Sequence, residues 1–573
     1  MILQALKEYY DRKAALADSD IAPPGWERKE LPFLIVIDQT GTPISIDDTR
    51  EGEGKKKRAK TFLIPQAIKR ASNIAANLLW DNPEYALGLV IKGRPDRVAE
   101  QHKMFCDRIA GIAVPDISPV AVVLRFLAKP DKIAALEKLQ GWEEIKETAP
   151  FLSFRVTGDA KPVFNCPDVA AALMKTATAP TSSTICLVTG AREEPERLHP
   201  AIKGIRDANS TGANIVSFNL DAFESFGKKS NDNATVGKTA TFAYSTALNT
   251  LLGKDSRQKL QVGDATTVFW ASKPNPLETL VCDFFSEPPK DNPDQQTEAV
   301  KALYKSVDAG TMAADDIDTR FYVLGLSPNA ARISIRFWHC GTVAEMSAHF
   351  RQHFDDLRIA HGPKDKDTFS LWRLLVSTAP LGKSENIPPN LAGDTMRAIL
   401  EGLPYPQTLL QSVIRRIIVE HDVTHVRAAL IKACLNRSLR SNNPNQEKEL
   451  AMSLDLANTN PGYRLGRLFA VLERIQERAN PGINATIRDR FYGAASGTPV
   501  TVFGNLMRLK NHHLSKLENT GERINYEKLI GEIMSEIGDF PAHLPLADQG
   551  RFAIGYYHQK QDFFTKKSDT KVD

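Results

Sequence analysis

Between Asn460 and Tyr557 the apolar residues recur every three or four positions, a spacing that places them on one side of an α-helix. Asn460 and Pro461 mark a helix start, because asparagine caps helices and proline loses no hydrogen bond at the first helical position. The first apolar stripe consists of Leu465, Leu468, Phe469, Leu472 and Ile475. Further helices are predicted over 484–492, after Thr498, from Asn525 and along 546–563. This stretch therefore predicts a compact bundle of about five helices.

Basic residues return repeatedly on this stretch, outside the apolar stripes, and predict a basic exterior for the bundle. The net charge of the whole chain is only +4, so any nucleic-acid binding must come from such local clusters. The cations in question are Arg464, Arg467, Arg488, Arg490, Arg508 and Lys510.

The first two thirds of the chain mix predicted strands with predicted helices. Phe33–Ile37 and Ile44–Ile46 flank a turn and predict a hairpin, and Phe321–Leu326 with Arg332–Trp338 predict a second. Other predicted strands cover 151–156, 184–189, 215–218, 266–270 and 279–284, and helices cover 96–112 and 118–139. We expect an α+β protein: a mixed α/β N-terminal domain with β-hairpins over 1–380, then an all-α domain over 381–573, divided at the proline-rich 380–389.

A glycine-loosened basic run precedes an apparent helix near the N-terminus. Its cations are Lys55, Lys56, Lys57, Arg58 and Lys60. Ile64, Ile68, Ala71, Ala75 and Leu78 then predict a helix whose polar face carries Lys69, Arg70 and Asn73. A solvated loop explains such a run equally well. A cationic loop beside a basic and amide-bearing face nevertheless supplies the phosphate charge and base-edge groups that DNA binding needs.

A second candidate segment lies between 211 and 233. Here a predicted strand leads into a loop rich in glycine, asparagine and lysine. Such a loop can be merely a turn, because asparagine and glycine accept left-handed backbone angles. It can also present amides and cations to nucleic acid. The candidate residues are Asn219, Lys228, Lys229, Asn231 and Asn233.

Each apparent catalytic motif is incomplete or has a simpler explanation. Gly237-Lys238-Thr239 and Gly382-Lys383-Ser384 end like phosphate-binding loops, but the first glycine of that motif is missing. His349 and His353 have metalloprotease spacing without the glutamate that would act as the base. His421-Asp422 lies among apolar residues at helical spacing, so packing explains it better. We therefore expect a non-enzymatic binding protein with no cofactor and no metal.

The cysteines and the apolar runs favour a cytoplasmic location. The six cysteines are scattered and form no C-x-x-C pair, which favours neither a zinc ribbon nor a disulfide framework. No apolar run reaches the roughly 18 residues that a membrane span needs. The first residues predict an amphipathic helix and contain no signal-peptide core.

Two C-terminal runs, Asn484–Pro499 and Asp548–His558, resemble one known family. It is the large subunit of the type I-C CRISPR surveillance complex, the Csd or Dvulg subtype. Similar signatures follow in order along the chain at Met1–Tyr10, Ser72–Asn77, Asp81-Asn82, Gly212–Asn219 and Phe321–Ala330. The resemblance therefore covers nearly the whole chain.

The resemblance implies a bacterial, RNA-guided DNA-binding complex (Cascade) in which guide pairing selects the target sequence and protein reads a short adjacent motif, the PAM. The large subunit would read the PAM in duplex DNA, promote strand separation and R-loop formation, and help recruit a Cas-three-type helicase–nuclease. Its partners would be the guide CRISPR RNA, the target DNA, Cas-five-type and Cas-seven-type subunits, and a Cas-eleven-type small subunit. The two N-terminal candidate segments would contact the PAM region, and the bundle cations would lie along the target or displaced strand.

Two other functions fit the residues less well: a nuclease with an unrecognised active site, and a scaffold that binds RNA only. The resemblance further implies a small subunit translated from inside the same gene. Met452 follows the polar linker Ser441–Gln446 and precedes the helix start at Asn460, so a product of 452–573 would contain the whole bundle. Glu447-Lys448-Glu449 just upstream can be encoded with a ribosome-binding sequence, although a charged helix start explains these residues too.

Overall fold

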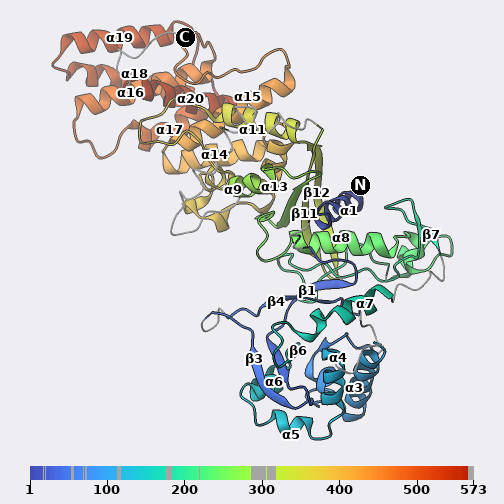
Figure 1. Ribbon diagram of the computed structural model, residues 1–573. Helices are drawn as coiled ribbons and strands as arrows, with labels where there is room; N and C mark the ends of the chain where they lie inside the picture. Colours follow the sequence, from blue (N-terminus) through green and yellow to red (C-terminus); the bar gives the residue numbers. More distant parts are fainter. Residues whose placement is uncertain are drawn as a thin grey trace. The chain divides into compact units, whose positions relative to one another are not determined.

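The computed structural model describes residues 1–16, 19, 21–52, 57–68, 70, 74–112, 118–175, 183–218, 220–285, 305 and 318–564. It has the expected α+β fold, with sheets in the N-terminal part and helices in the C-terminal part (Figure 1). The chain forms two compact units. The first comprises Met1–Gly204, Ala208–Thr250 and Ala330–Arg332, and the second Ile205–Asp207, Leu251–Asn329 and Ile333–Asp573.

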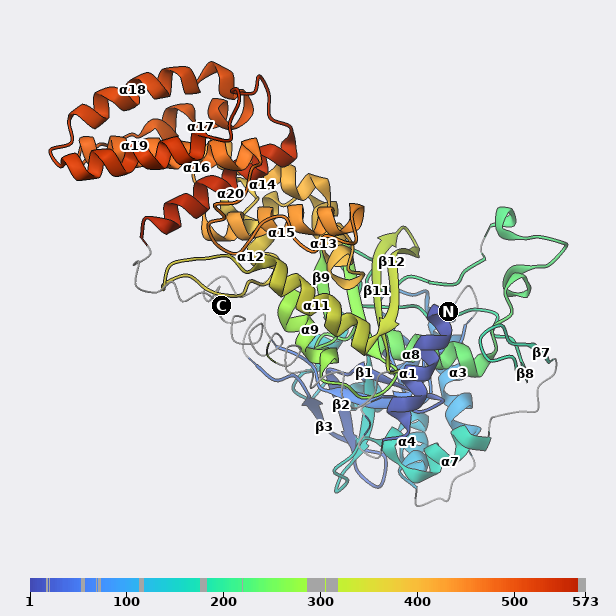
Figure 2. The same cartoon turned by 90° about the horizontal axis from the view of Figure 1, so that it is seen from above.

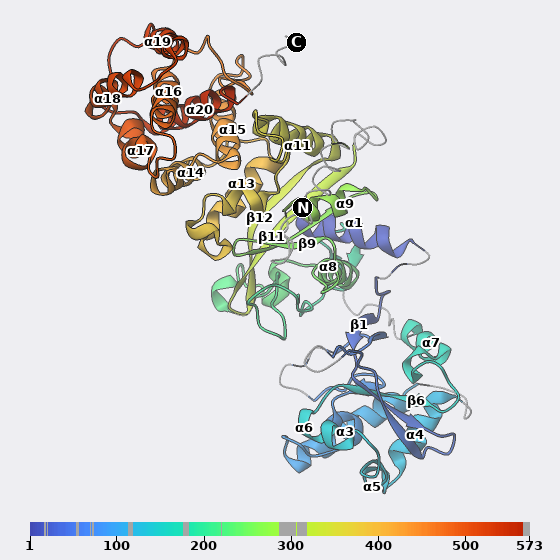
Figure 3. The ribbon, with the colours of Figure 1, turned by 90° about the vertical axis from the view of Figure 1, so that its left-hand side faces the viewer.

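A four-stranded sheet in the order β3-β2-β6-β5 forms the core of the first unit (Figure 3). Its strands are β2 (Phe33–Ile37), β3 (Pro43–Asp48), β5 (Trp80–Asp81) and β6 (Leu152–Val156). All five residues of β2 are buried, which explains why this strand is uniformly apolar. Ile35 pairs with Ile46 in an antiparallel register, so the predicted first hairpin is confirmed. The strands β2 and β6 run parallel.

Helices pack against this sheet through aromatic side chains. Phe105 of α3 and Phe126 of α4 lie with their ring centroids 6.4 and 5.8 Å from that of Phe154 in β6. The predicted helix over 118–139 divides at Pro130 into α4 and α5. The helices are α1 (Ile2–Ala14), α2 (Pro83–Leu87), α3 (Pro95–Ala110), α4 (Pro119–Ala128), α5 (Lys132–Leu136), α6 (Trp142–Thr148), α7 (Pro167–Lys175) and α8 (Lys238–Leu251), with short 3-10 turns at Val163–Asn165, Asp221–Phe223 and Ser230–Asn233.

The helix predicted from the apolar residues between 64 and 78 is wrong. Thr61–Pro65 forms strand β4, which pairs antiparallel with β1 (Trp26–Glu30), and the described residues after Pro65 form no regular structure before β5. Ile64 lies in β4 and is fully buried. It is apolar because its side chain packs beneath this strand, and not because it belongs to the buried face of a helix. The small pair β7 (Thr184–Ile185) and β8 (Arg192–Glu193) completes the strands of this unit.

The second unit contains an antiparallel sheet in the order β12-β11-β10-β9. Its strands are β9 (Lys259–Val262), β10 (Ala265–Ala271), β11 (Arg320–Asn329) and β12 (Arg332–Thr342). The second predicted hairpin, β11–β12, is confirmed. The strand predicted over 279–284 is wrong: Leu277–Phe285 is the helix α9, because Leu277, Val281 and Phe284 share one buried helical face. The helices α9 and α11 (Val343–Leu357) pack near this sheet (Figure 2).

The remaining helices form the C-terminal part of the second unit. The 3-10 turns Pro380–Gly382 and Ser384–Asn386 link α12 to α13, so the proline-rich segment 380–389 lies within this unit. The helices are α12 (Leu371–Val376), α13 (Pro389–Leu400), α14 (Gln407–Glu420), α15 (His425–Asn442), α16 (Pro461–Ala479), α17 (Ile487–Gly497), α18 (Phe503–Ser515), α19 (Thr520–Met534) and α20 (Leu546–Asp562), with a 3-10 turn at Pro499–Thr501.

The predicted five-helix bundle corresponds to α16–α20. Asn460 caps α16 as expected, accepting a hydrogen bond from the backbone N–H of Tyr463 at 3.2 Å. Asn519 and not Asn525 caps α19. The helices α16 and α20 cross at very short distance through two glycines: a Cβ at Gly466 would lie 2.0 Å from the carbonyl oxygen of Phe552, and one at Gly555 would lie 2.0 Å from that of Tyr463.

We expect Gly466→Ala or Gly555→Ala to separate the two helices and lower the free energy of unfolding by about 1–3 kcal/mol, the usual cost of overpacking a core. Gly531→Ala on α19 is the matched control, because no atom lies within 4 Å of its added methyl group. This control is expected to be neutral or slightly stabilising. Thermal and denaturant unfolding measure both. Equal stability of all three variants would contradict the close crossing.

Candidate nucleic-acid interface

The N-terminal basic loop joins β3 to β4 in the first unit. Its two ends are held together by a backbone pair, in which Glu51 and Arg58 exchange two N–H···O bonds of 2.9 Å. Lys57, Arg58 and Lys60 are exposed, and the Lys60 ammonium lies 5.8 Å from the ring centroid of Phe62. The structure thus presents three of the predicted cations to solvent. Lys55 and Lys56 lie outside the described residues.

Arg70 has a different environment from these lysines. Its Nε donates to the carbonyl of Ala75 at 2.6 Å, its guanidinium lies 3.9 Å from the ring centroid of Tyr85, and it forms an ion pair with Asp81. Asp81 is fully buried, and burial raises the pKa of its carboxyl group although the hydrogen bond from Arg70 opposes the shift. Arg70 therefore links the backbone at Ala75 to the buried carboxylate of Asp81. Lys69 and Asn73 lie outside the described residues.

The second candidate segment also differs from the prediction. The residues predicted as a strand over 215–218 form bends and coil, and Asn219 lies outside the described residues. Lys228 and Lys229 are exposed, but Asn231 is buried and donates its amide N–H to the carbonyl oxygen of Glu196. The amide of Asn233 bonds to backbone groups of its own loop. Lys228 and Lys229 thus face solvent, whereas the amides of Asn231 and Asn233 are engaged within the protein.

Arg464 and Arg467 do not contribute to a basic exterior of the bundle. Arg467 is fully buried between Gln559 and Glu532, with donor–acceptor distances of 3.1 and 3.0 Å. The guanidinium of Arg464 donates to the carbonyl oxygens of Glu532 and Ile533, at 3.1 and 3.2 Å, and so satisfies the end of α19. The sequence placed both outside the apolar stripe of α16, but α19 and α20 cover that side of the helix as well.

The other cations of the bundle are more accessible. Arg488 is half-buried, with its Nε 3.7 Å from the buried carboxylate of Glu473. Arg490 on α17 and Arg508 on α18 are exposed, and Lys510 is half-exposed. Two further exposed cations on α19, Arg523 and Lys528, were not singled out from the sequence. No sequence pattern around these two residues, apart from their charge, distinguishes them from other surface cations. The accessible cations named here thus lie on α17, α18 and α19.

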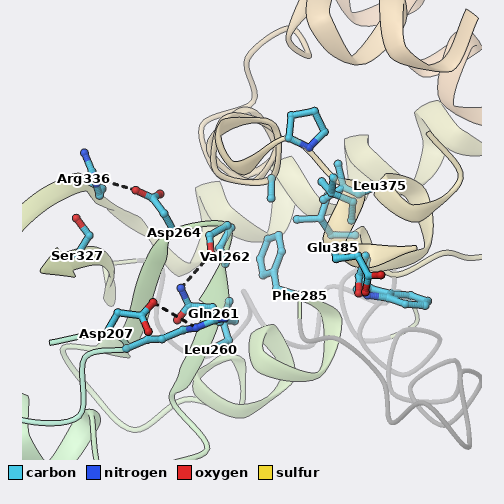
Figure 4. A pocket seen from close by; sticks show the side chains of 18 of the residues that line it. Asp207, Leu260, Gln261, Val262, Asp264, Phe285, Ser327, Arg336, Leu375 and Glu385 are labelled. Atoms are coloured by element: carbon cyan, nitrogen blue, oxygen red, sulfur yellow. Dashed lines mark hydrogen bonds and ion pairs between the residues drawn. The ribbon is translucent and has the colours of Figure 1, made fainter. Parts of the chain in front are cut away.

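A cavity of about 830 Å³ lies within the second unit (Figure 4). One wall carries Arg336, whose guanidinium lies 2.7 Å from the carboxylate of Asp264. The other wall is apolar and includes Phe285 and Leu375. Because the charges of the ionic wall are paired and Glu385 adds a further acid, this cavity is poorly suited to a phosphate backbone. The cations that suit nucleic acid lie on the loops and helices described above.

The histidines of the incomplete motifs make internal contacts. His349 Nδ1 lies 2.7 Å from the carbonyl oxygen of Leu400, and the buried His353 bonds to the hydroxyl of Tyr405. The ring of His425 lies against that of His361, with centroids 4.5 Å apart and the planes tilted by 36°, and burial lowers the pKa of His425 to about 4. Within the described ranges, no group of three histidine, cysteine or acidic side chains is arranged to hold a metal ion.

The model of one protein family, CRISPR-associated protein (Cas_Csd1), matches residues 6–564. The chain belongs to this family. No protein in the curated collection of characterised sequences matches it. The family assignment agrees with the resemblance seen in the sequence and makes the chain a CRISPR-associated protein. In the part of this Cas_Csd1 protein that the structure describes, none of the helices has the length and hydropathy to span a bilayer.

We expect Arg70→Ala to lower the free energy of unfolding by about 3 kcal/mol, because it leaves the buried carboxylate of Asp81 without its cation. The double variant Arg70→Ala with Asp81→Asn removes that unpaired charge, so it is expected to be more stable than the single variant. Lys57→Ala is the control for loss of an exposed cation and is expected to change stability little. Denaturant unfolding of the three variants checks this. A loss of stability from Lys57→Ala as large as that from Arg70→Ala would contradict the structural role.

Proposed function

We propose that this Cas_Csd1 protein is the large subunit of a type I-C surveillance complex. In this role it reads the PAM in duplex DNA, promotes strand separation and R-loop formation, and helps recruit a Cas-three-type helicase–nuclease. It has no catalytic activity of its own and works with guide CRISPR RNA, Cas-five-type and Cas-seven-type subunits, and a Cas-eleven-type small subunit. The family match over residues 6–564 supports membership of the CRISPR machinery, and the finer role is our proposal.

The observation that most directly supports DNA binding is the exposed basic loop between β3 and β4. Its ends are joined by the backbone pair of Glu51 and Arg58. Lys57, Arg58 and Lys60 are accessible, and Lys55 and Lys56 belong to the same run of the sequence. Cations on such a loop suit phosphate contacts, which position a protein on a duplex whatever its sequence. Arg70 is already bonded internally, so base-edge contacts must come from other residues.

We also propose that the bundle is made twice, once within this chain and once as a separate small subunit of 452–573. Its aromatic core supports this, because the ring of Phe469 contacts those of Tyr492, Phe503, Phe552 and Tyr556, all of which lie beyond Met452. Such a core lets a product of 122 residues fold by usual size limits. Arg490, Arg508 and Lys510 would then lie along a DNA strand in each copy.

The basic loop is tested by replacing Lys55, Lys56, Lys57, Arg58 and Lys60 with glutamine in the assembled complex. Affinity for a PAM-bearing duplex should fall, and each lost phosphate contact should flatten the slope of log K against log[salt] by about one unit. Binding is measured across a salt series. The control replaces Lys103, Lys138 and Lys161 of the same unit, which are also exposed. Unchanged affinity and slope in the loop variant would leave the loop without a DNA role.

Metal-dependent DNA cleavage by the purified chain would instead indicate an enzyme.

The separate small subunit is tested by expressing the untagged gene. A fragment of about 14 kDa, corresponding to 122 of the 573 residues of the 63.4-kDa chain, should appear beside the full-length protein. It should vanish when Met452 is replaced by leucine or when codons 447–449 are changed synonymously. Met507→Leu is the control, because it changes a methionine inside the bundle and should leave the fragment in place. If the untagged gene never yields the fragment, the bundle serves only this chain.

A further inference from the structure

Phe226 stands at the tip of the loop Glu224–Asn233 with its side chain 100% exposed. The next most exposed large apolar side chain among the described residues is Leu381 at 80%. The backbone of Phe226 has a φ of +53°, a left-handed conformation that a bulky side chain rarely adopts. Burying a phenylalanine side chain would stabilise the fold, and a turn with this positive φ usually contains glycine. An exposed aromatic residue in a strained backbone conformation therefore indicates contact with a partner molecule.

The loop is held in this conformation by the side chain of Asn233. Its Nδ2 donates to the carbonyl oxygens of Lys228 and Ser230 at 3.0 and 2.9 Å, and its Oδ1 accepts from the backbone N–H of Ser225 at 2.9 Å. One amide thus bonds on both sides of the tip. Three hydrogen bonds to backbone groups fix the path of the chain around Phe226.

Glu224 and Asn231 add to this support. The carboxylate of Glu224 accepts from the backbone N–H of Ser230 at 3.0 Å and lies 2.7 Å from the ammonium of Lys229. The amide of Asn231 is buried and ties the loop to the carbonyl of Glu196, outside the loop. The loop is therefore built before any partner arrives, so little conformational freedom remains to be lost on binding.

The chemistry of the tip favours a nucleobase as the partner. A protein interface surrounds its central aromatic with other apolar groups, whereas Phe226 is flanked by Ser225, Gly227 and Lys228. Single-stranded nucleic acid is bound by aromatic rings that stack on bases, with cations beside them for the phosphates. Lys228 and Lys229 are exposed and supply that charge. Space around the tip is open, since no atom lies within 4 Å of a Cβ added at Gly227.

We infer that Phe226 stacks on an unpaired base of the DNA target and holds it out of the duplex. Asn233, Glu224 and Asn231 are positioning residues that keep the ring presented. This replaces the sequence-based prediction that the asparagines themselves face the DNA, because their amides are engaged within the protein. The inference rests on the proposed function, since it requires that the complex opens a duplex.

The test uses the assembled complex and two targets that share one PAM: a linear duplex, and the same duplex with mismatched bases beside the PAM. We expect Phe226→Ala to slow R-loop formation on the linear duplex roughly 10-fold, the scale of one lost base–aromatic stack, with little change on the opened target. Phe226→Trp should restore the rate, and Phe226→Leu should not. Leu381→Ala removes another exposed apolar side chain and serves as the control.

A fluorescent base analogue beside the PAM reports the stack directly. Its emission should be quenched by the wild-type complex and by Phe226→Trp, and not by Phe226→Ala. Asn233→Ala should weaken the quenching more than it lowers the affinity for the PAM duplex, a difference that a purely structural role for Asn233 would not produce.

Two contrary outcomes would overturn the inference about Phe226, and a third would overturn the proposed function. If Phe226→Ala opens the linear duplex at the wild-type rate, the inference is wrong and the proposed function stands. Loss of subunit assembly in this variant would mean that Phe226 binds a protein, which also overturns the inference. If the wild-type complex does not distinguish a PAM duplex from other DNA, the proposed function itself fails.

Discussion

The crossing of α16 and α20 is the constraint on which the C-terminal part of the molecule depends. Gly466 and Gly555 bring the two backbones so close that no side chain fits between them. Two helices in such contact act as one rigid element, against which the other helices of the bundle pack. The ring of Phe469 then meets aromatic side chains from α17, α18 and α20. Without the two glycines these contacts would lose the common axis around which they are arranged.

The same crossing decides which cations of the bundle can meet a partner. Because α19 and α20 cover one side of α16, Arg464 and Arg467 become internal hydrogen-bond donors, whereas α17, α18 and α19 carry exposed cations. A similar division holds in the first unit, where Arg70 neutralises a buried carboxylate and the loop before β4 carries exposed cations. In both units some basic side chains stabilise the fold through internal hydrogen bonds, and others are exposed and can contact a partner. Charge alone therefore does not identify a binding residue. A basic residue whose side chain reaches an internal acceptor stabilises the fold, and one that does not can contact nucleic acid.

Features set by neighbouring residues could be predicted from the sequence. The run Phe33–Ile37 and the start of α16 at Asn460 are encoded locally, by β-branched residues in one case and by a cap in the other. Features set by distant partners could not. The apolar residues from Ile64 to Leu78 follow a helical period, yet Ile64 lies in β4, which pairs with β1, and Arg70 is paired with the distant Asp81. For the same reason the polar run around Asn233 did not disclose that its amides turn inward.

The ion pair between Arg551 and Glu449 joins α20 to a residue that precedes Met452, with Nη2 and Oε2 2.9 Å apart. In the full-length chain Arg551 is therefore neutralised by Glu449 as well as by Asp548. A bundle that began at Met452 would lack Glu449, so Arg551 would keep only Asp548 of these two carboxylate partners and its positive charge would be less fully compensated. The two products of one gene would then share every residue of the bundle and still differ in surface potential. Identical sequence would not mean identical affinity for a polyanion.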